Sequence, residues 1–217
     1  MRLAVPLEIT EGEKRVALVP DAIAQLLKIG HTVVVQSGAG HRAGFSDELY
    51  KAAGATIESD ASALYAGAEM VLKIQRPTSG ISGSELDMLA ADAVLIGLLQ
   101  PSGDPEIFRD LASRNITACS MELVPRTTRA QMMDVLSSQS TVAGYKGVLT
   151  AANSLKKFFP MLMTAAGTVK PARVLVIGAG VAGLQAIATA RRIGAVVEAF
   201  DTRPVVKEQV QSLGATF

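Results

Sequence analysis

The sequence predicts an α/β protein in which parallel sheets are covered by helices. Three observations lead to this class: short apolar runs alternate with helical segments along the chain, a glycine-rich turn joins one such run to a helix, and one long stretch holds no strand. Alternation of this kind is typical of parallel sheets. With 217 residues, 49% of them hydrophobic, the chain is long enough for two small domains with apolar cores.

The predicted strands are short runs dominated by valine, isoleucine and leucine. They are Leu3–Val5, Thr32–Val35, Met70–Ile74, Val94–Leu98, Ile116–Cys119, Arg173–Ile177 and Val196–Phe200. Capping chemistry sets helix boundaries between them. Ser46 and Asp47 begin a helix that Gly54 ends, and Asp104 precedes a helix with Pro105 at its first position.

The stretch Pro125–Lys157 interrupts this alternation. We expect a helix beginning near Thr128, then a polar turn and a longer helix over Val142–Phe158. A domain boundary is expected within this stretch, with a first domain over residues 1–138 and a second over 139–217.

Polar residues in this stretch allow two interpretations. On a helix beginning near Thr128, Gln131, Asp134 and Ser138 share one face, which could line a cleft. Alternatively, Thr128 and Gln131 form a capping box, and Asp134 forms a solvated ion pair with a nearby arginine. Spacing does not choose between them.

Composition excludes several classes of function. The 21 basic and 20 acidic residues leave a net charge of +1, which predicts no nucleic-acid partner and favours a small-molecule ligand. Charged residues or prolines interrupt every apolar stretch before the roughly 18 residues of a membrane span, so we expect no membrane insertion. Cys119, the only cysteine, excludes an internal disulfide, and we expect it to be buried. We expect no metal site.

A dinucleotide-binding motif follows the predicted strand Arg173–Ile177. The run Gly178-Ala179-Gly180-Val181-Ala182-Gly183 matches G-x-G-x-x-G and leads into a helix. Gly178 permits a tight turn, Gly180 lets the backbone approach a pyrophosphate, and Gly183 lets the helix pack closely on its strand. The pyrophosphate would lie at the start of the helix, beside Val181 and Ala182.

An acidic residue stands where this motif requires one. Asp201 ends the strand Val196–Phe200 and is expected to accept hydrogen bonds from the adenosine ribose, beside Thr202 and Arg203. Its carboxylate would repel a 2′-phosphate, so NAD(H) is favoured over NADP(H), although Arg203 could weaken this exclusion. The chain stops after one strand-helix-strand unit, so we expect two Rossmann-like, doubly wound domains of which the second is incomplete.

Several segments resemble the N-terminal region shared by alanine dehydrogenases and transhydrogenase α subunits. They are residues 13–20 (EKRVALVP), 38–40 (GAG), 44–47 (GFSD) and 53–55 (AGA). The segments 121–126 (MELVPR) and 134–139 (DVLSSQ) are similar to the transhydrogenase members in particular.

The resemblance implies the NAD(H)-binding component of a proton-translocating transhydrogenase. In that family, hydride passes directly from NADH to NADP⁺ on a partner component, while a membrane-spanning component moves protons. A homodimer is implied, peripheral on the cytoplasmic side of a bacterial inner membrane or on the mitochondrial matrix side. Carried onto this sequence, the resemblance implies that Arg126, Gln131, Asp134 and Ser137 hold the nicotinamide end, with Arg126 and Asp134 paired beside the carboxamide.

An NAD-dependent alanine dehydrogenase is the alternative. Arg15 and Lys73 occupy the places where the resemblance puts that family's substrate-binding cations. Gln100 lies in the segment where the catalytic histidine of those enzymes would fall, and His31 and His41 are the only histidines. This absence favours the transhydrogenase interpretation, because oxidising an amino acid requires a proton-transferring group.

Overall fold

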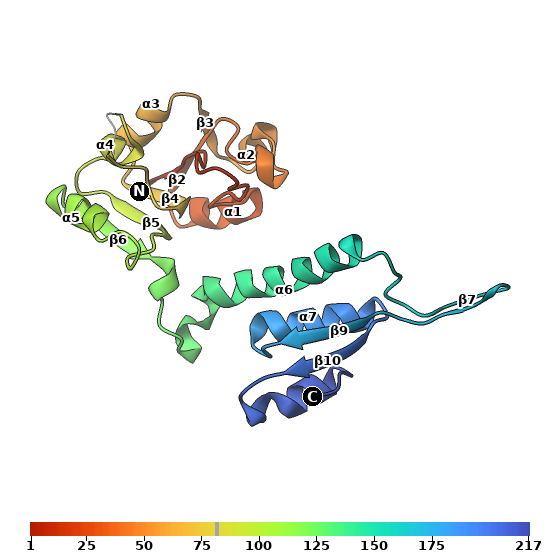
Figure 1. The fold of residues 1–217 in the computed structure, drawn as a ribbon. Helices are drawn as coiled ribbons and strands as arrows, with labels where there is room; N and C mark the ends of the chain where they lie inside the picture. Colours follow the sequence, from red (N-terminus) through yellow and green to blue (C-terminus); the bar gives the residue numbers. More distant parts are fainter. Residues whose placement is uncertain (81–82) are drawn as a thin grey trace. The chain divides into compact units, whose positions relative to one another are not determined.

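The computed structural model describes residues 1–80 and 83–217 as two compact units, Met1–Met133 and Asp134–Phe217 (Figure 1). The predicted boundary between residues 138 and 139 lies in the first turns of the helix that opens the second unit. That helix begins after Asp134 and belongs as a whole to the second unit.

The first unit contains a six-stranded sheet in the order β3-β2-β1-β4-β5-β6, and every pair of neighbouring strands is parallel. This order is that of the doubly wound Rossmann sheet, which confirms the predicted class. The strands are β1 (Arg2–Val5), β2 (Thr32–Gln36), β3 (Thr56–Glu58), β4 (Met70–Gln75), β5 (Val94–Leu98) and β6 (Thr117–Ser120). The short edge strand β3 was not predicted.

Helices connect these strands across both faces of the sheet. They are α1 (Pro20–Lys28), α2 (Asp47–Ala52), α3 (Ala61–Ala66), α4 (Glu85–Met88) and α5 (Glu106–Ser113), with 3₁₀ turns at His41–Ala43, Met121–Leu123 and Thr128–Met133. Successive strand residues enter different cores. Leu3 and Val5 pack with Ile23 and Tyr50, whereas Ala4 packs with Leu64 in a second cluster. Each face of the sheet therefore has its own apolar core, as the alternation of a strand requires.

The second unit combines a two-stranded parallel sheet with packed helices. Its elements are α6 (Val135–Ser154), β7 (Leu162–Thr164), β8 (Gly167–Val169), β9 (Arg173–Ile177), α7 (Val181–Arg192), β10 (Val196–Phe200), a 3₁₀ turn (Pro204–Val206) and α8 (Lys207–Ser212). Strands β9 and β10 pair in the register that joins Val176 to Ala199. The antiparallel hairpin β7–β8, which was not predicted, extends away from the rest of this unit (Figure 1).

Three local predictions were wrong. The helix expected over Val142–Phe158 is α6, which begins earlier, at Val135, and ends at Ser154 because Leu155 has an extended backbone (φ −76°, ψ 129°). Thr128–Met133 forms a 3₁₀ helix, so no α-helical face unites Gln131, Asp134 and Ser138. Cys119 is exposed, because it lies on the edge strand β6.

Among the residues that the structure describes, no helix combines the length and the hydropathy needed to cross a bilayer.

Candidate dinucleotide-binding site

The glycine turn between β9 and α7 has the geometry that its sequence predicts. Gly178 has φ +97°, a left-handed conformation that glycine adopts without strain. Gly180 is the N-cap of α7 and supplies no side-chain cap to the helix. The first backbone N–H groups of α7, at Val181, Ala182 and Gly183, lack helical acceptors by their position. The turn therefore presents backbone donors and the positive end of a 12-residue helix.

Two glycines of the motif differ in what surrounds them. A Cβ atom built on Gly183 would lie 1.8 Å from the carbonyl oxygen of Gly178, so only glycine lets the helix pack this closely on the turn. A Cβ atom on Gly180 would meet no protein atom within 4 Å. The packing of this unit therefore explains Gly183, whereas the space beside Gly180 is free for a ligand.

Asp201 ties the end of β10 to the glycine turn. Its Oδ2 accepts a hydrogen bond from the backbone N–H of Ala179 at 2.7 Å. The same carboxylate accepts from Arg203, from the backbone N–H at 2.8 Å and from the guanidinium Nε at 3.0 Å. The Arg203 guanidinium is the main reason that the pKa of Asp201 is held well below its usual range. The aspartate is thus ionised and oriented, as a ribose-binding acid must be. Thr202, between the two residues, is exposed.

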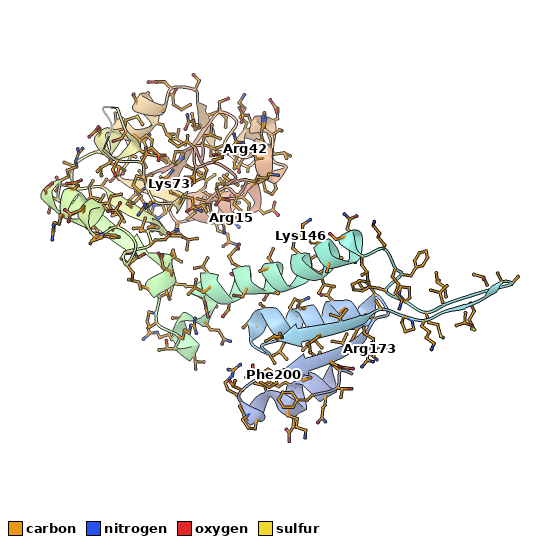
Figure 2. All side chains as sticks on the ribbon, in the orientation of Figure 1. Arg15, Arg42, Lys73, Lys146, Arg173 and Phe200 are labelled. Atoms are coloured by element: carbon orange, nitrogen blue, oxygen red, sulfur yellow. The ribbon has the colours of Figure 1, made fainter. Side chains whose placement is uncertain are left out.

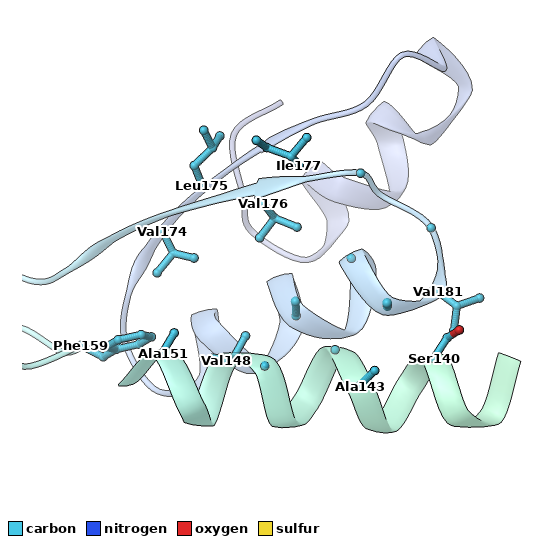
Figure 3. A pocket seen from close by; sticks show the side chains of 17 residues that line it. Ser140, Ala143, Val148, Ala151, Phe159, Val174, Leu175, Val176, Ile177 and Val181 are labelled. Carbon is cyan, nitrogen blue, oxygen red and sulfur yellow. The ribbon is translucent and has the colours of Figure 1, made fainter. Parts of the chain in front are cut away.

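An apolar groove of about 690 Å³ runs along β9 between that strand and α6, and one end of it reaches the glycine turn (Figure 3). Val174 and Val176 point toward the helices, whereas Leu175 and Ile177 point to the opposite side of the strand (Figure 3). Gly144 of α6 lines the groove, and a Cβ atom there would lie 2.1 Å from the carbonyl oxygen of Ala182. The sequence analysis did not identify Gly144, although a glycine inside a helix is a known indication of close packing.

The four residues expected at the nicotinamide end fall in both units. Arg126 and Gln131 are exposed in the first unit, Gln131 within the 3₁₀ turn Thr128–Met133. Asp134 and Ser137 lie together at the start of α6, where the carboxylate of Asp134 accepts hydrogen bonds from the backbone N–H of Ser137 at 2.9 Å and from its hydroxyl at 2.6 Å. Ser137, not Ser138, is therefore the partner of Asp134. The pairing of Arg126 with Asp134 stays a prediction.

Lys73 lies in a buried cluster of charges within the first unit (Figure 2). Its ammonium group is 2.6 Å from a carboxylate oxygen of Glu85 and 3.3 Å from one of Glu8, and its side chain is 1% exposed. Tyr65 also donates to Glu85, at 2.9 Å, and burial is the main cause that raises the pKa of its hydroxyl. The sequence analysis missed these partners, which are far from Lys73 in the chain.

Arg15 lies beside this cluster and pairs with Glu13, with Nη2 2.6 Å from Oε2. The guanidinium of Arg15 and a hydrogen bond from Gln75 lower the pKa of Glu13 to about 2. The cluster lies where β1 and β4 are adjacent, at the point where the strand order of the sheet reverses. In this structure both cations expected for an alanine dehydrogenase thus have carboxylate partners in the protein.

The fold and the glycine turn define a class: doubly wound α/β proteins in which a strand, a G-x-G-x-x-G turn and a helix are followed by a strand ending in an acidic residue. The particular family follows from comparison with known proteins. Residues 4–143 match the family model described as "Alanine dehydrogenase/PNT, N-terminal domain", and residues 147–217 match its C-terminal counterpart. The chain belongs to the alanine dehydrogenase/PNT family.

Individual relatives refine this placement. In Rhodospirillum rubrum, the first of the polypeptides that make up NAD(P) transhydrogenase subunit alpha is 50% identical to this chain, over 100% of this chain and 57% of that protein. A solved transhydrogenase structure from Sinorhizobium meliloti gives a TM-score of 0.95 at 45% identity, over 100% of this chain and 61% of that one. An alanine dehydrogenase of Halomonas elongata is 37% identical over 93% of this chain and 53% of that protein. The chain thus spans little more than half of the length of these relatives.

Proposed function

We propose that this chain is the NAD(H)-binding part of a proton-translocating transhydrogenase, and that it positions NADH for direct hydride transfer to NADP⁺ on a partner component. The observation that carries the proposal is the open space beside Gly180, between the free N–H groups of α7 and the oriented carboxylate of Asp201. The identity to transhydrogenase α subunits over the whole of this chain supports it.

The residues around the turn fit the adenosine and pyrophosphate of NAD(H). The N–H groups at Gly180, Val181 and Ala182 would hold the pyrophosphate, helped by the positive end of α7. Asp201 would accept hydrogen bonds from the ribose hydroxyls, and its negative charge disfavours the 2′-phosphate of NADP(H). NADP(H) would therefore be bound by the partner component.

At the other end of the cofactor, the proposal assigns Arg126, Gln131, Asp134 and Ser137 to the nicotinamide. NADH supplies a hydride from its C4 carbon, and direct transfer to a second nicotinamide requires no proton donor at that carbon. The task of these residues is to fix the ring and exclude water. The hydrogen bonds from Ser137 hold the Asp134 carboxylate in one orientation, as such a task requires.

The complete assembly would include a membrane-spanning component, an NADP(H)-binding component and a second copy of this chain. This chain would be peripheral, on the cytoplasmic side of a bacterial inner membrane or on the mitochondrial matrix side. The name "subunit alpha" of the relatives is consistent with a complex of several subunits.

Alanine dehydrogenase activity remains the alternative, since relatives of that name share 37% and 34% identity. Two observations speak against it. Gln100 stands in the segment expected to hold the histidine of those enzymes, and the Lys73 ammonium is enclosed by Glu8 and Glu85. A substrate carboxylate would have to displace one of these glutamates.

The test uses the full-length protein that contains this chain, mixed with its partner components. Oxidation of NADH by NADP⁺ should fall sharply in Asp134→Asn and Gln131→Ala, while the affinity for ADP, measured by calorimetry, stays unchanged because ADP lacks the nicotinamide. Unchanged rates in both variants would overturn the nicotinamide assignment. Turnover of L-alanine with NAD⁺ in the absence of any partner would establish the alternative.

A further inference from the structure

The carboxylate of Asp201 has no acceptor position left for a ligand in this structure. An ionised carboxylate offers about four lone-pair sites. Four donors contact Asp201: the N–H of Ala179 at 2.7 Å, the N–H of Arg203 at 2.8 Å, and its guanidinium Nε at 3.0 Å and Nη2 at 3.1 Å. The side chain of Asp201 is only 6% exposed as a result.

These four donors are of two kinds. The N–H groups of Ala179 and Arg203 belong to the backbone, one to each oxygen of the carboxylate, and they stay in place while the turn keeps its shape. The other two come from one guanidinium whose side chain is 58% exposed. A long exposed side chain exchanges rotamers in nanoseconds or less, so these two bonds are the replaceable ones.

The two replaceable bonds match what an adenosine ribose offers, because its 2′- and 3′-hydroxyls are also two adjacent donors. We propose that the guanidinium of Arg203 occupies the place of the ribose hydroxyls on Asp201, so that Arg203 competes with NAD(H) for this carboxylate and lowers its affinity. This inference rests on the proposed function, since it concerns the same site.

The ion pair has a second consequence, for the choice between NADH and NADPH. While Arg203 lies beside Asp201, it offsets the negative charge that repels a 2′-phosphate. Removing the guanidinium leaves that charge without its partner. The loss of Arg203 should therefore strengthen the binding of NADH, weaken the binding of NADPH and widen the discrimination between them.

The test compares Arg203→Gln and Arg203→Lys with the unaltered full-length protein, by calorimetric titration of NADH and NADPH. An exposed ion pair is a weak competitor, so Arg203→Gln should bind NADH about two- to fivefold more tightly and NADPH less tightly. Arg203→Lys should lie between, because lysine keeps the charge without the planar pair of donors. The matched control is Arg173→Gln, which breaks the exposed Arg173–Glu198 pair on the same sheet and should change neither affinity.

ADP and 2′,3′-dideoxy-ADP separate competition at the ribose from other effects. The gain in Arg203→Gln should be present for ADP and absent for the dideoxy compound, which has no hydroxyl to place on Asp201. Unchanged or weaker NADH binding in Arg203→Gln, or an equal gain for both ADP compounds, would overturn the inference and leave the proposed function intact. Absence of NADH binding by the unaltered protein would overturn both.

Discussion

The carboxylate of Asp134 accepts two hydrogen bonds from Ser137, one from its backbone N–H at 2.9 Å and one from its hydroxyl at 2.6 Å. Asp134 is the N-cap of α6, the 20-residue helix that opens the second unit. One contact thus ends the 3₁₀ turn Thr128–Met133, begins α6 and fixes the carboxylate that the proposed function places beside the nicotinamide.

This capping role predicts how Asp134 variants differ. Asp134→Ala should lower the free energy of unfolding by about 1 kcal/mol, because the first turn of α6 loses its cap, whereas Asp134→Asn should cost much less since asparagine caps equally well. Thermal or urea denaturation checks both. Ser138→Ala is the control, because its hydroxyl bonds only to backbone carbonyls of the same segment and its loss should cost little. Equal stability of the alanine and asparagine variants would contradict the capping role.

Two glycines of α6 should respond in opposite ways to alanine. Gly144→Ala places a methyl group 2.1 Å from the carbonyl oxygen of Ala182 and should destabilise the protein by about 1–3 kcal/mol. Gly147, one turn further along, has no neighbour within 4 Å of such a methyl group, so Gly147→Ala should stabilise the helix by about 0.5–1 kcal/mol. Urea titration of the two variants measures both changes. A stabilised Gly144→Ala protein would show that α6 and α7 do not pack this closely.

Lys73 should be essential to stability because of its position between Glu8 and Glu85. Lys73→Met leaves two buried carboxylates without their cation, which should cost about 3–5 kcal/mol in the free energy of unfolding. The matched control is Arg76→Met, since the Arg76–Asp104 pair is partly exposed (side chains 39% and 32%) and should be worth less than about 1 kcal/mol. Similar losses in the two variants would mean that the cluster is not buried in solution.

Glu13 should make the stability of the protein depend on pH in the acid range. Its pKa falls from 4.5 to about 2 in the folded state, through the guanidinium of Arg15 and the amide of Gln75. The unfolded chain therefore binds a proton more tightly than the folded one. The stabilisation is fully present above about pH 5 and is lost as the pH falls toward 2.

The variant Glu13→Gln should lose this part of the pH dependence. Its stability should be lower than that of the unaltered protein at pH 7 and should decrease less between pH 5 and pH 2, measured by urea denaturation at each pH. Parallel curves for the two proteins would exclude Glu13 as the group responsible.

Local sequence patterns were sufficient for much of the fold. The strands β9 and β10 were predicted with their ends, and the glycine turn was placed between β9 and α7, because side-chain branching and glycine act on their immediate neighbours. The start of α6 was wrong for a related reason. Asp134 and Ser137 are close enough in the sequence to show a capping pattern, but hydrophobic periodicity was given more weight than capping.

The sequence by itself therefore determined the α/β class, the glycine turn, the acidic residue at the end of β10 and the family resemblance. Only the tertiary structure decided which groups these residues meet. Glu8 and Lys73 are 65 positions apart, and Gly144 touches a helix that begins at Val181. Contacts of this kind depend on how strands and helices pack, which short-range propensities do not encode, and so the charge partners of Lys73 and the reason for Gly144 became visible only in the folded protein.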